Sequence, residues 1–191
     1  MTTDQKLSGT IRKLLPSETD AFRDHLLRLD KDARRMRFAH SVSEDFIAEY
    51  ASRMLDNGSV VYGYVEDGAV KAVAELKKLG DSWGTEGEAA FSVEADMQDK
   101  GIGTELMGLV IRSARNRGVN RLFMSCLAEN TRMQAIARKH EADLKFEYGE
   151  VIGEIVPSSP NYFSVLAEAV GDRVGYMLAV LDLSARLSRA A

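Results

Sequence analysis

Alternating hydrophobic and polar positions in the first half of the chain predict an antiparallel sheet. Residues 59–66 alternate in polarity and are rich in valine and tyrosine, and the Asp67-Gly68 pair after them is a strong two-residue hairpin signal. A second strand over Ala69–Leu76 pairs back, and the apolar run at 89–93 forms a third. A short β-like segment, Gly9–Leu15, precedes these three strands.

Apolar residues at three- and four-residue spacing predict helices between and after the strands. Ser17 and Ser43 have the form of helix N-caps, Gly118 has that of a C-terminal cap, and Asn130 starts a further helix. The expected elements are helices near 17–29 and 43–55, a helix at Thr104–Arg117, a strand at Arg121–Leu127, a helix from Asn130 and a hairpin of 144–148 with 150–156. This mixture predicts an α/β (α+β) fold.

The sequence Pro157-Ser158-Ser159-Pro160 is typical of a linker-like break. We therefore expect one domain over residues 1–156 and a C-terminal helical extension over residues 157–191. Apolar residues keep helical spacing in this extension, at Val165, Leu166, Ala169, Val170, Val174, Met177, Leu178 and Leu181. A wide apolar face needs a partner, so we expect the helix to pack on its own domain or on a partner subunit.

The composition predicts a soluble globular chain. A length of 191 residues with 45% hydrophobic residues suffices for a proper core. The formal net charge of −4 argues against a nucleic-acid binder that acts through general positive potential, and no apolar run is long enough to cross a bilayer. The single cysteine, Cys126, and the lack of an apolar leader at the start predict a cytoplasmic protein.

The stretch Ala89–Leu109 has the pattern of a site: an apolar strand, a polar turn with Gly101 and Gly103, and a helix. Glycines let a backbone approach an anion closely, and the first N–H groups of a helix lack intrahelical partners. A tight turn without a ligand gives the same pattern, so both interpretations stay open at this point. A dinucleotide fingerprint is excluded because Leu106 stands where a third glycine is required.

Two motifs carry a resemblance to a known family. The run Gln98-Asp99-Lys100-Gly101-Ile102-Gly103 resembles the Gln/Arg-x-x-Gly-x-Gly/Ala motif of the GNAT superfamily, the acyl-CoA-dependent N-acyltransferases. The run Glu129-Asn130-x-x-Met133 is similar to the Glu-Asn-x-x-Met that often opens the family's next helix. The order of elements over residues 9–156 also resembles theirs. The resemblance implies a mixed, mostly antiparallel sheet flanked by helices, in which the fourth and fifth strands splay apart.

The resemblance further implies acetyl-CoA as the acyl-donor substrate, with no metal. Backbone N–H groups of the turn would hold the CoA pyrophosphate, Val93 would meet the pantetheine arm and the acyl carbonyl, and Asn130 would meet its far side. The acyl group would lie between the strands that hold Val93 and Leu127. The implied cofactor-binding residues are Val93, Gln98, Asp99, Lys100, Gly101, Ile102, Gly103, Thr104, Asn130 and Met133.

Direct transfer needs a base that removes a proton from the acceptor amine, often a carboxylate acting through water. The candidates are Glu88 and Glu75, with Glu94 beside the motif. Strand alternation places Glu88, Ser92 and Glu94 on one face unless a bulge intervenes. A solvated strand carboxylate is the alternative for each. The group Arg34, Arg35 and Arg37 is interpreted as a solvated basic face.

Two departures from the family pattern bear on catalysis. The family's frequent acid, a tyrosine on the helix after strand five, is replaced by Ala137, and Asp99 stands where many members have glycine. We therefore predict an N-acetyltransferase that moves an acetyl group from CoA to a primary amine in a ternary complex, and we keep a degenerate, non-catalytic acyl-CoA-binding sensor or scaffold as the alternative. The expected partners are a small-molecule or protein amine and a second copy in a homodimer, without nucleic acid or membrane.

Overall fold

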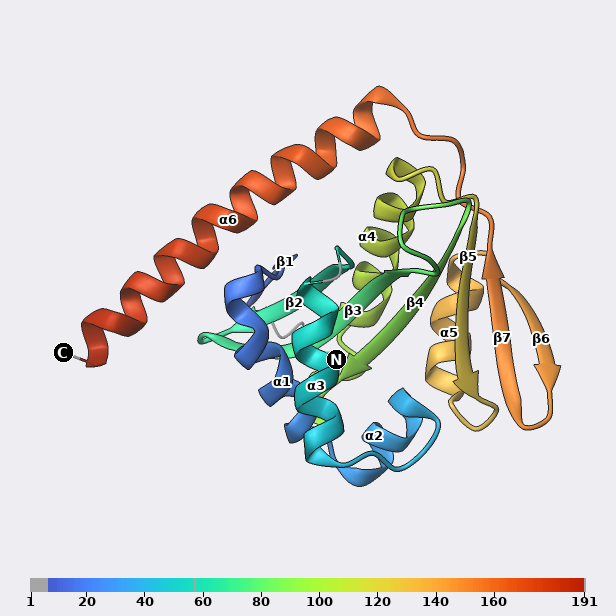
Figure 1. The fold of residues 1–191 in the computed structure, drawn as a ribbon, viewed down its shortest axis with the longest axis horizontal. Coiled ribbons are helices and arrows are strands. Elements are labelled where there is room, and N and C mark those ends of the chain that lie inside the picture. Colours follow the sequence, from blue (N-terminus) through green and yellow to red (C-terminus); the bar gives the residue numbers. More distant parts are fainter. Residues whose placement is uncertain (1–6, 57, 191) are drawn as a thin grey trace, which may run out of the picture.

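The computed structural model describes residues 7–56 and 58–190, which form one mixed sheet with helices on both faces (Figure 1). Across the sheet, the strands follow the order β1 (Thr10–Lys13), β2 (Val60–Glu66), β3 (Ala69–Lys78), β4 (Glu86–Val93), β5 (Arg121–Leu127), β7 (Glu150–Ile155) and β6 (Asp143–Glu147). The pairing of β4 with β5 is parallel, and the other pairings are antiparallel.

Two layers of helices cover the sheet and make two hydrophobic cores. On one face lie α1 (Thr19–Arg28), α2 (Lys31–Phe38) and α3 (Glu44–Asp56), and on the other lie α4 (Ile102–Asn116) and α5 (Thr131–Lys139) (Figure 1). The first core joins Phe22, Leu26 and Ile47 to the valines of β2 and β3. The second joins the apolar side of α4 to Ala72, Ala74, Leu76 and Ala89. Ala89, Phe91 and Val93 of β4 face the second core, and the alternate residues of the strand face the side of α1, α2 and α3.

The last helix, α6 (Tyr162–Ala190), crosses the outside of the domain and contacts α4 and β1 (Figure 1). It does so with its polar side. Glu168 is buried and accepts hydrogen bonds from Ser113, Asn116 and Arg117, and Asp172 pairs with Lys13 at 3.2 Å. The apolar face that the sequence predicts is instead exposed, because this polar network turns it away from the domain.

The local signals in the sequence found most of the elements. The Asp67-Gly68 hairpin is confirmed, with positive φ at both residues, and the strand Arg121–Leu127 and the cap at Gly118 are also confirmed. Ser43 accepts a hydrogen bond from the Phe46 N–H, as an N-cap should. The prediction that Ser17 is a helix N-cap is wrong, because Ser17 lies within the 3₁₀ turn Pro16–Glu18 and α1 begins after Glu18.

Candidate active site

The strands β4 and β5 pair over only three residues and then part, which opens a cleft. Their ladder joins Glu86–Glu88 to Arg121–Phe123, whereas β4 pairs with β3 as far as Val93. The expected splay of these two strands is therefore confirmed. A cleft of about 590 Å³ lies beyond the parting point, between α2, the end of β4, the first turn of α4 and the first turns of α5. Phe91, Ser92 and Val93 form its wall on β4.

The open edge of β4 leaves backbone groups without a neighbouring strand. The Glu94 N–H donates to the Lys71 carbonyl of β3 at 3.0 Å. Because backbone groups point alternately to the two edges of a strand, the N–H and C=O of Val93 point to the edge that β5 has left. The Gln98 side chain donates to the Val93 carbonyl at 3.1 Å and fixes this end of the strand. The Val93 N–H is thus directed into the cleft, where an acyl carbonyl or an amide can accept from it.

The glycine turn presents the N-terminus of α4 to the same cleft. Gly101 has φ +82° and is the N-cap of α4, a left-handed conformation that favours glycine. A Cβ on Gly103 would lie 2.9 Å from Ile136 Cδ1 of α5, so any side chain here would force Ile136 to shift. The first N–H groups of α4 lack intrahelical acceptors and carry the positive end of the helix dipole. The turn can therefore hold an anion such as a pyrophosphate.

Asp99, next to the glycine turn, is paired with a cation of α5. Its side chain is 76% exposed and pairs with Arg132 of α5 at 3.5 Å, and Arg132 also donates to the Gln98 side chain. The guanidinium of Arg132 and the amine of Lys139 both line the cleft. The charge of Asp99 is therefore offset by Arg132 and does not stand alone beside the turn.

Nine of the ten expected cofactor-binding residues line the cleft: Val93, Gln98, Asp99, Gly101, Ile102, Gly103, Thr104, Asn130 and Met133. Lys100 is the exception; it does not line the cleft, and its Nζ lies 3.7 Å from Met97 Sδ. The Asn130 side chain accepts from the Met133 N–H at 3.1 Å and so caps α5. Sequence reasoning missed the wall from α1 and α2, where Leu29, Ala33, Met36 and Arg37 lie, because only the packed helices show it.

Neither of the two expected catalytic carboxylates is part of the cleft lining. Glu75 is 0% exposed, and its two oxygens accept hydrogen bonds from Arg37 at 2.5 Å and from Tyr50 at 2.6 Å. Burial raises the pKa of the Tyr50 phenol, and the negative Glu75 adds to that shift. Glu88 pairs with Lys77 at 3.1 Å at the paired end of β4, with 42% of its side chain exposed. Arg37 is buried in this ion pair, so its interpretation as part of a solvated basic face is wrong.

A third carboxylate, Glu94, belongs to a network with His25 and Ser92 that sequence reasoning did not find. Ser92 Oγ lies 2.8 Å from His25 Nε2, and His25 Nδ1 lies 3.1 Å from Glu94 Oε1. Glu94 also accepts from Arg28 and Lys71, each at 3.0 Å. The signal in the sequence was a histidine on the buried stripe of α1, between Phe22 and Leu26. Regular pairing of β4 with β3 confirms that Glu88 and Ser92 share one face, and Glu94 lies on the side of Ser92 because both contact His25.

The titrating groups of this network have shifted pKa values. Burial raises the pKa of Glu94, but hydrogen bonds from His25, Lys71 and Arg28 outweigh it and bring the pKa to about 2. Burial lowers the pKa of His25 below its usual value, against the opposing effect of Glu94. At neutral pH, Glu94 is therefore ionised and the imidazole is neutral. An ionised carboxylate can only accept, so the ring proton lies on Nδ1 and Nε2 is free to accept from Ser92.

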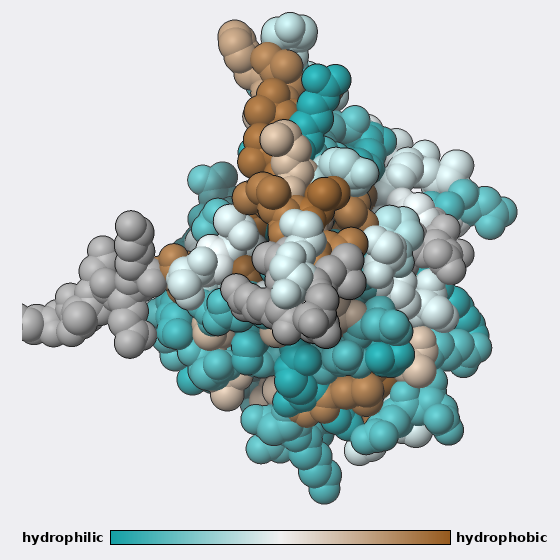
Figure 2. Space-filling model, turned by 90° about the vertical axis from the view of Figure 1, so that its left-hand side faces the viewer, coloured by the Kyte–Doolittle hydropathy of each residue, from teal (hydrophilic) through white to brown (hydrophobic). Residues whose placement is uncertain are grey.

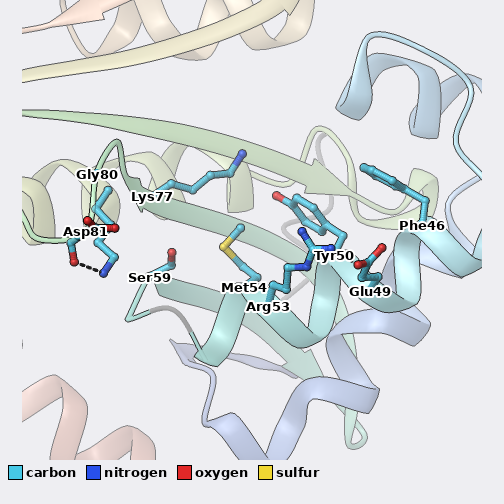
Figure 3. Close-up of a pocket in the computed structure, with 10 residues that line it drawn as sticks. Phe46, Glu49, Tyr50, Arg53, Met54, Ser59, Lys77, Gly80 and Asp81 are labelled. Carbon is cyan, nitrogen blue, oxygen red and sulfur yellow. Dashed lines mark hydrogen bonds and ion pairs between the residues drawn. The ribbon is translucent and has the colours of Figure 1, made fainter.

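A second hollow of about 460 Å³ lies between α3 and the loop after β3 (Figure 3). Lys77 and Tyr50 extend into it from neighbouring elements, and the Lys77 ammonium lies 5.6 Å from the Tyr50 ring centre. Phe46, Glu49 and Arg53 of α3 form its outer side. The hollow shares no lining residue with the larger cleft, and none of the expected site residues lines it.

The described part of the chain carries neither a metal-binding cluster nor a membrane-spanning helix. Across 7–56 and 58–190, no group of three or more His, Cys, Asp or Glu side chains could hold a metal ion. None of the helices in those ranges is both long and apolar enough to cross a membrane. Cys126 is buried, and burial raises the pKa of its thiol, which disfavours the reactive thiolate.

A mixed sheet with one parallel pair that parts beside a glycine turn is the architecture of the GNAT fold, and the comparisons agree. The model of the acetyltransferase (GNAT) family matches residues 23–141, so the chain belongs to this family. None of the curated proteins matches the sequence.

Solved structures of the same fold are similar to the chain at low sequence identity. The GNAT domain of S. lividans PAT matches with a TM-score of 0.65 and 19% identity, covering 78% of this chain and 90% of that one. YncA, a putative acetyltransferase from Salmonella typhimurium with its cofactor acetyl-CoA, matches with a TM-score of 0.58 and 18% identity over 82% of this chain and 99% of that one. A phosphinothricin acetyltransferase from Sinorhizobium meliloti in complex with acetyl-CoA gives a TM-score of 0.60 and 15% identity, over 82% and 95%.

Proposed function

We propose that the protein is an N-acetyltransferase that moves an acetyl group from acetyl-CoA to a primary amine. The observation that carries this proposal is the meeting of two sets of backbone N–H groups in one cleft. The first turn of α4 offers its N–H groups to an anion, and Val93 offers its N–H to a carbonyl at the open edge of β4. A pyrophosphate joined to a thioester by an amide-bearing arm matches both sets.

The donor would lie along the cleft from α4 to β4. Its pyrophosphate would rest on the turn at Lys100–Thr104, where the first N–H groups of α4 point outward. Its pantetheine arm would run between Val93 and Asn130. The Val93 N–H would then donate to the thioester oxygen as negative charge develops there in the transition state. Two of the similar structures are described with acetyl-CoA, which supports the choice of donor.

The acceptor would attack as a neutral amine in a ternary complex, so a base must take its proton. Glu88 and Glu75 remain the proposed carboxylates, and their surroundings favour different roles. Glu75 has both oxygens occupied by Arg37 and Tyr50 and no exposed surface, so we assign it the positioning of Arg37 in the cleft wall. Glu88 is partly exposed and can receive a proton through water.

A second candidate function is a module that binds acyl-CoA without turnover, as a sensor or scaffold. The observation that favours it is Ala137, which is fully buried on α5 and offers no hydroxyl to protonate a leaving thiolate. Both functions need the same CoA cleft. The two functions differ in whether the acetyl group of bound acetyl-CoA is transferred to an amine.

We also propose a cytoplasmic location and a second copy of the chain as a partner, with neither nucleic acid nor membrane as a ligand. The formal net charge of −4 supports the exclusion of nucleic acid and membrane, because both are negatively charged and attract basic proteins.

The test combines acetyl-CoA binding with release of CoA thiol in the presence of a panel of primary amines. We expect micromolar binding by calorimetry and amine-dependent thiol release. Binding without release from any amine would support the sensor, and absence of binding would overturn both candidates. The Gly84→Val variant is the matched control for changes in the turn, because a Cβ on Gly84 meets nothing within 4 Å.

A further inference from the structure

The network of Ser92, His25 and Glu94 connects the cleft to a buried base. Ser92 lines the cleft and is 7% exposed, whereas His25 is 0% exposed and is reached only through Ser92 or Glu94. The distances, 2.8 Å from Ser92 Oγ to His25 Nε2 and 3.1 Å from His25 Nδ1 to Glu94, are those of a hydroxyl, a base and an orienting carboxylate in sequence. The three residues come from two elements, α1 and the end of β4.

The position of Ser92 places its hydroxyl on the side from which an acceptor would come. A donor paired with the open edge of β4 lies in the plane of the sheet, and a nucleophile attacks a carbonyl from above or below that plane. The α4 face is filled by the core around Ala89. On the other face, Ser92 and the α2 residues Met36 and Arg37 line the cleft together. An amine on this face would lie beside Ser92 Oγ.

We propose that Ser92 and His25, in place of Glu88, take the proton of the acceptor amine during acetyl transfer, with Glu94 as the positioning residue; this rests on the proposed function. The amine nitrogen forms the bond to the acetyl carbon while its proton passes to Ser92 Oγ and the Ser92 proton passes to His25 Nε2. The carbon–sulfur bond breaks, and CoA leaves as a thiolate. His25 returns its proton through Ser92 to the sulfur, which leaves an amide and free CoA thiol.

The surroundings of His25 suit this transfer. Arg28 of α1 and Lys71 of β3 both pair with Glu94. The charge of Glu75 on β3 also acts on His25. Glu94 and Glu75 favour the transient imidazolium, whereas Arg28 and the loss of water disfavour it. The result is a neutral imidazole at rest that can be charged briefly next to an ionised carboxylate.

The test is steady-state kinetics of His25→Gln, Ser92→Ala and Ser92→Thr, with His40→Gln as the control at an exposed histidine. A Gln side chain can bond to both neighbours but cannot carry the proton. We expect His25→Gln to lower kcat by about 100-fold or more with little change in the KM for acetyl-CoA. Ser92→Ala should lower kcat, and Ser92→Thr should restore most of it because the hydroxyl returns. Thermal unfolding of each variant separates a loss of fold from a loss of chemistry.

The following results would overturn the proposal. One is an unchanged kcat in a folded His25→Gln protein while Glu88→Gln abolishes the acid limb of the pH profile, which would assign the base to Glu88. Another is nitrogen NMR of the wild-type protein showing the His25 proton on Nε2 at neutral pH. If the wild-type protein transfers acetyl to no amine, the proposed function fails together with this one. Transfer that persists in His25→Gln overturns this proposal alone.

A different observation concerns the outer face of α6, where hydrophobic residues gather in a column (Figure 2). Eleven large hydrophobic side chains of this helix are 45–77% exposed. The residues Phe163, Leu166, Val170, Val174, Met177 and Leu181 recur at intervals of three and four, which places them in one stripe. The opposite side of the helix, with Ser164, Glu168 and Gly175, is anchored on the domain. The helix cannot turn this stripe inward without breaking the anchoring network.

We infer that this stripe pairs with the same stripe of a second copy of the chain, as two α6 helices packed about a twofold axis. Its six side chains expose on the order of 600 Å², so two copies would bury about 1,200 Å² in total, the lower end of the range for a stable interface. The six stripe residues are uncharged, so the stripe needs no oppositely charged partner. A twofold dimer brings the same surface of both copies together, which suits an apolar stripe. A membrane surface fits poorly, because the chain has a net charge of −4 and Arg173 is the only basic residue among those of α6 whose side chains are described.

Sedimentation equilibrium of the full chain tests this pairing. We expect a dimer for the wild-type protein, and a monomer that still binds acetyl-CoA for Val170→Glu combined with Met177→Glu. The control is Leu79→Glu, which changes a residue 56% exposed outside α6 and should leave the dimer intact. A wild-type monomer at tens of micromolar would overturn the inference, as would a dimer that persists in the double variant. Binding of the wild-type protein to anionic vesicles, lost in the double variant, would assign the stripe to a membrane instead.

Discussion

The two ends of β4 differ in what holds them. At the paired end, Glu86–Glu88 join β5 by backbone hydrogen bonds, and the ion pairs above them, such as Arg121 with Glu86, are half-exposed. At the open end, β4 has no pairing with β5, and ion pairs among buried side chains hold the neighbouring face of the sheet to α1 and α2. The ion pair of Arg37 with Glu75 is 6% and 0% exposed, and Glu94 holds three partners.

This difference shows how one strand can be both scaffold and site. The backbone groups of the open end are free for a ligand because no strand covers them, and the side-chain networks keep that end in place. Buried charges are costly to leave unpaired, whereas exposed pairs contribute little. Changes at the open end should therefore have large effects, and changes at the paired end should have small ones.

Removing Arg37 should give the largest effect, because it leaves the Glu75 carboxylate buried without its cation. We expect Arg37→Ala to lower the free energy of unfolding by about 3–5 kcal/mol. Urea denaturation measures it. A loss below about 1 kcal/mol would mean that water or another cation reaches Glu75, and the contrast between the two ends would fail.

Filling the glycine turn should abolish most donor binding. A Val side chain at Gly103 meets Ile136 and pushes it into the cleft, so acetyl-CoA affinity should fall by about 100-fold, or roughly 2.7 kcal/mol. Calorimetry compares this variant with the Gly84→Val control. Equal affinities of the two variants would show that the donor does not rest on this turn.

Low pH should lower the free energy of unfolding, because protonation of Glu94 removes its ion pairs at the open end of β4. Its pKa is about 2 in the folded protein and near the usual glutamate value when unfolded, so its stabilisation is complete above pH 4.5 and is lost as the pH falls from there toward 2. Glu94→Gln should flatten this part of the stability–pH curve, as measured by thermal unfolding at stepped pH. A variant curve parallel to that of the wild type would place the sensitivity elsewhere.

The smallest effect is expected at the paired end. Arg121 bonds to Glu86 and Glu154 on the surface, so Arg121→Ala should cost less than about 1 kcal/mol and leave donor binding unchanged. Urea denaturation beside Arg37→Ala gives the direct comparison. A cost similar to that of Arg37→Ala would remove the distinction between the two ends.

The sequence predicted those parts of the molecule that depend on neighbouring residues. The hairpin at Asp67-Gly68, the turn at Gly101 and the cap at Asn130 follow from local backbone chemistry, and the structure has all three. The burial of Arg37 and the pairing of His25 with Glu94 depend on how α1 and α2 pack on the sheet. Arg37 is 38 residues from its partner Glu75 in the sequence, and His25 is 69 residues from Glu94, so no local signal reports either contact. Periodicity found the apolar face of α6, but the polar network of Glu168 decides which way that face points.

The central claim is that the cleft transfers acetyl from CoA to an amine. Incubation with acetyl-CoA labelled in the acetyl group and a panel of primary amines, followed by mass spectrometry of the products, tests it most directly. The account predicts label in an amide product, at a rate that falls in the Gly103→Val variant and not in Gly84→Val. Label that stays in intact acetyl-CoA while the protein binds it, or label released only as acetate, would contradict the claim.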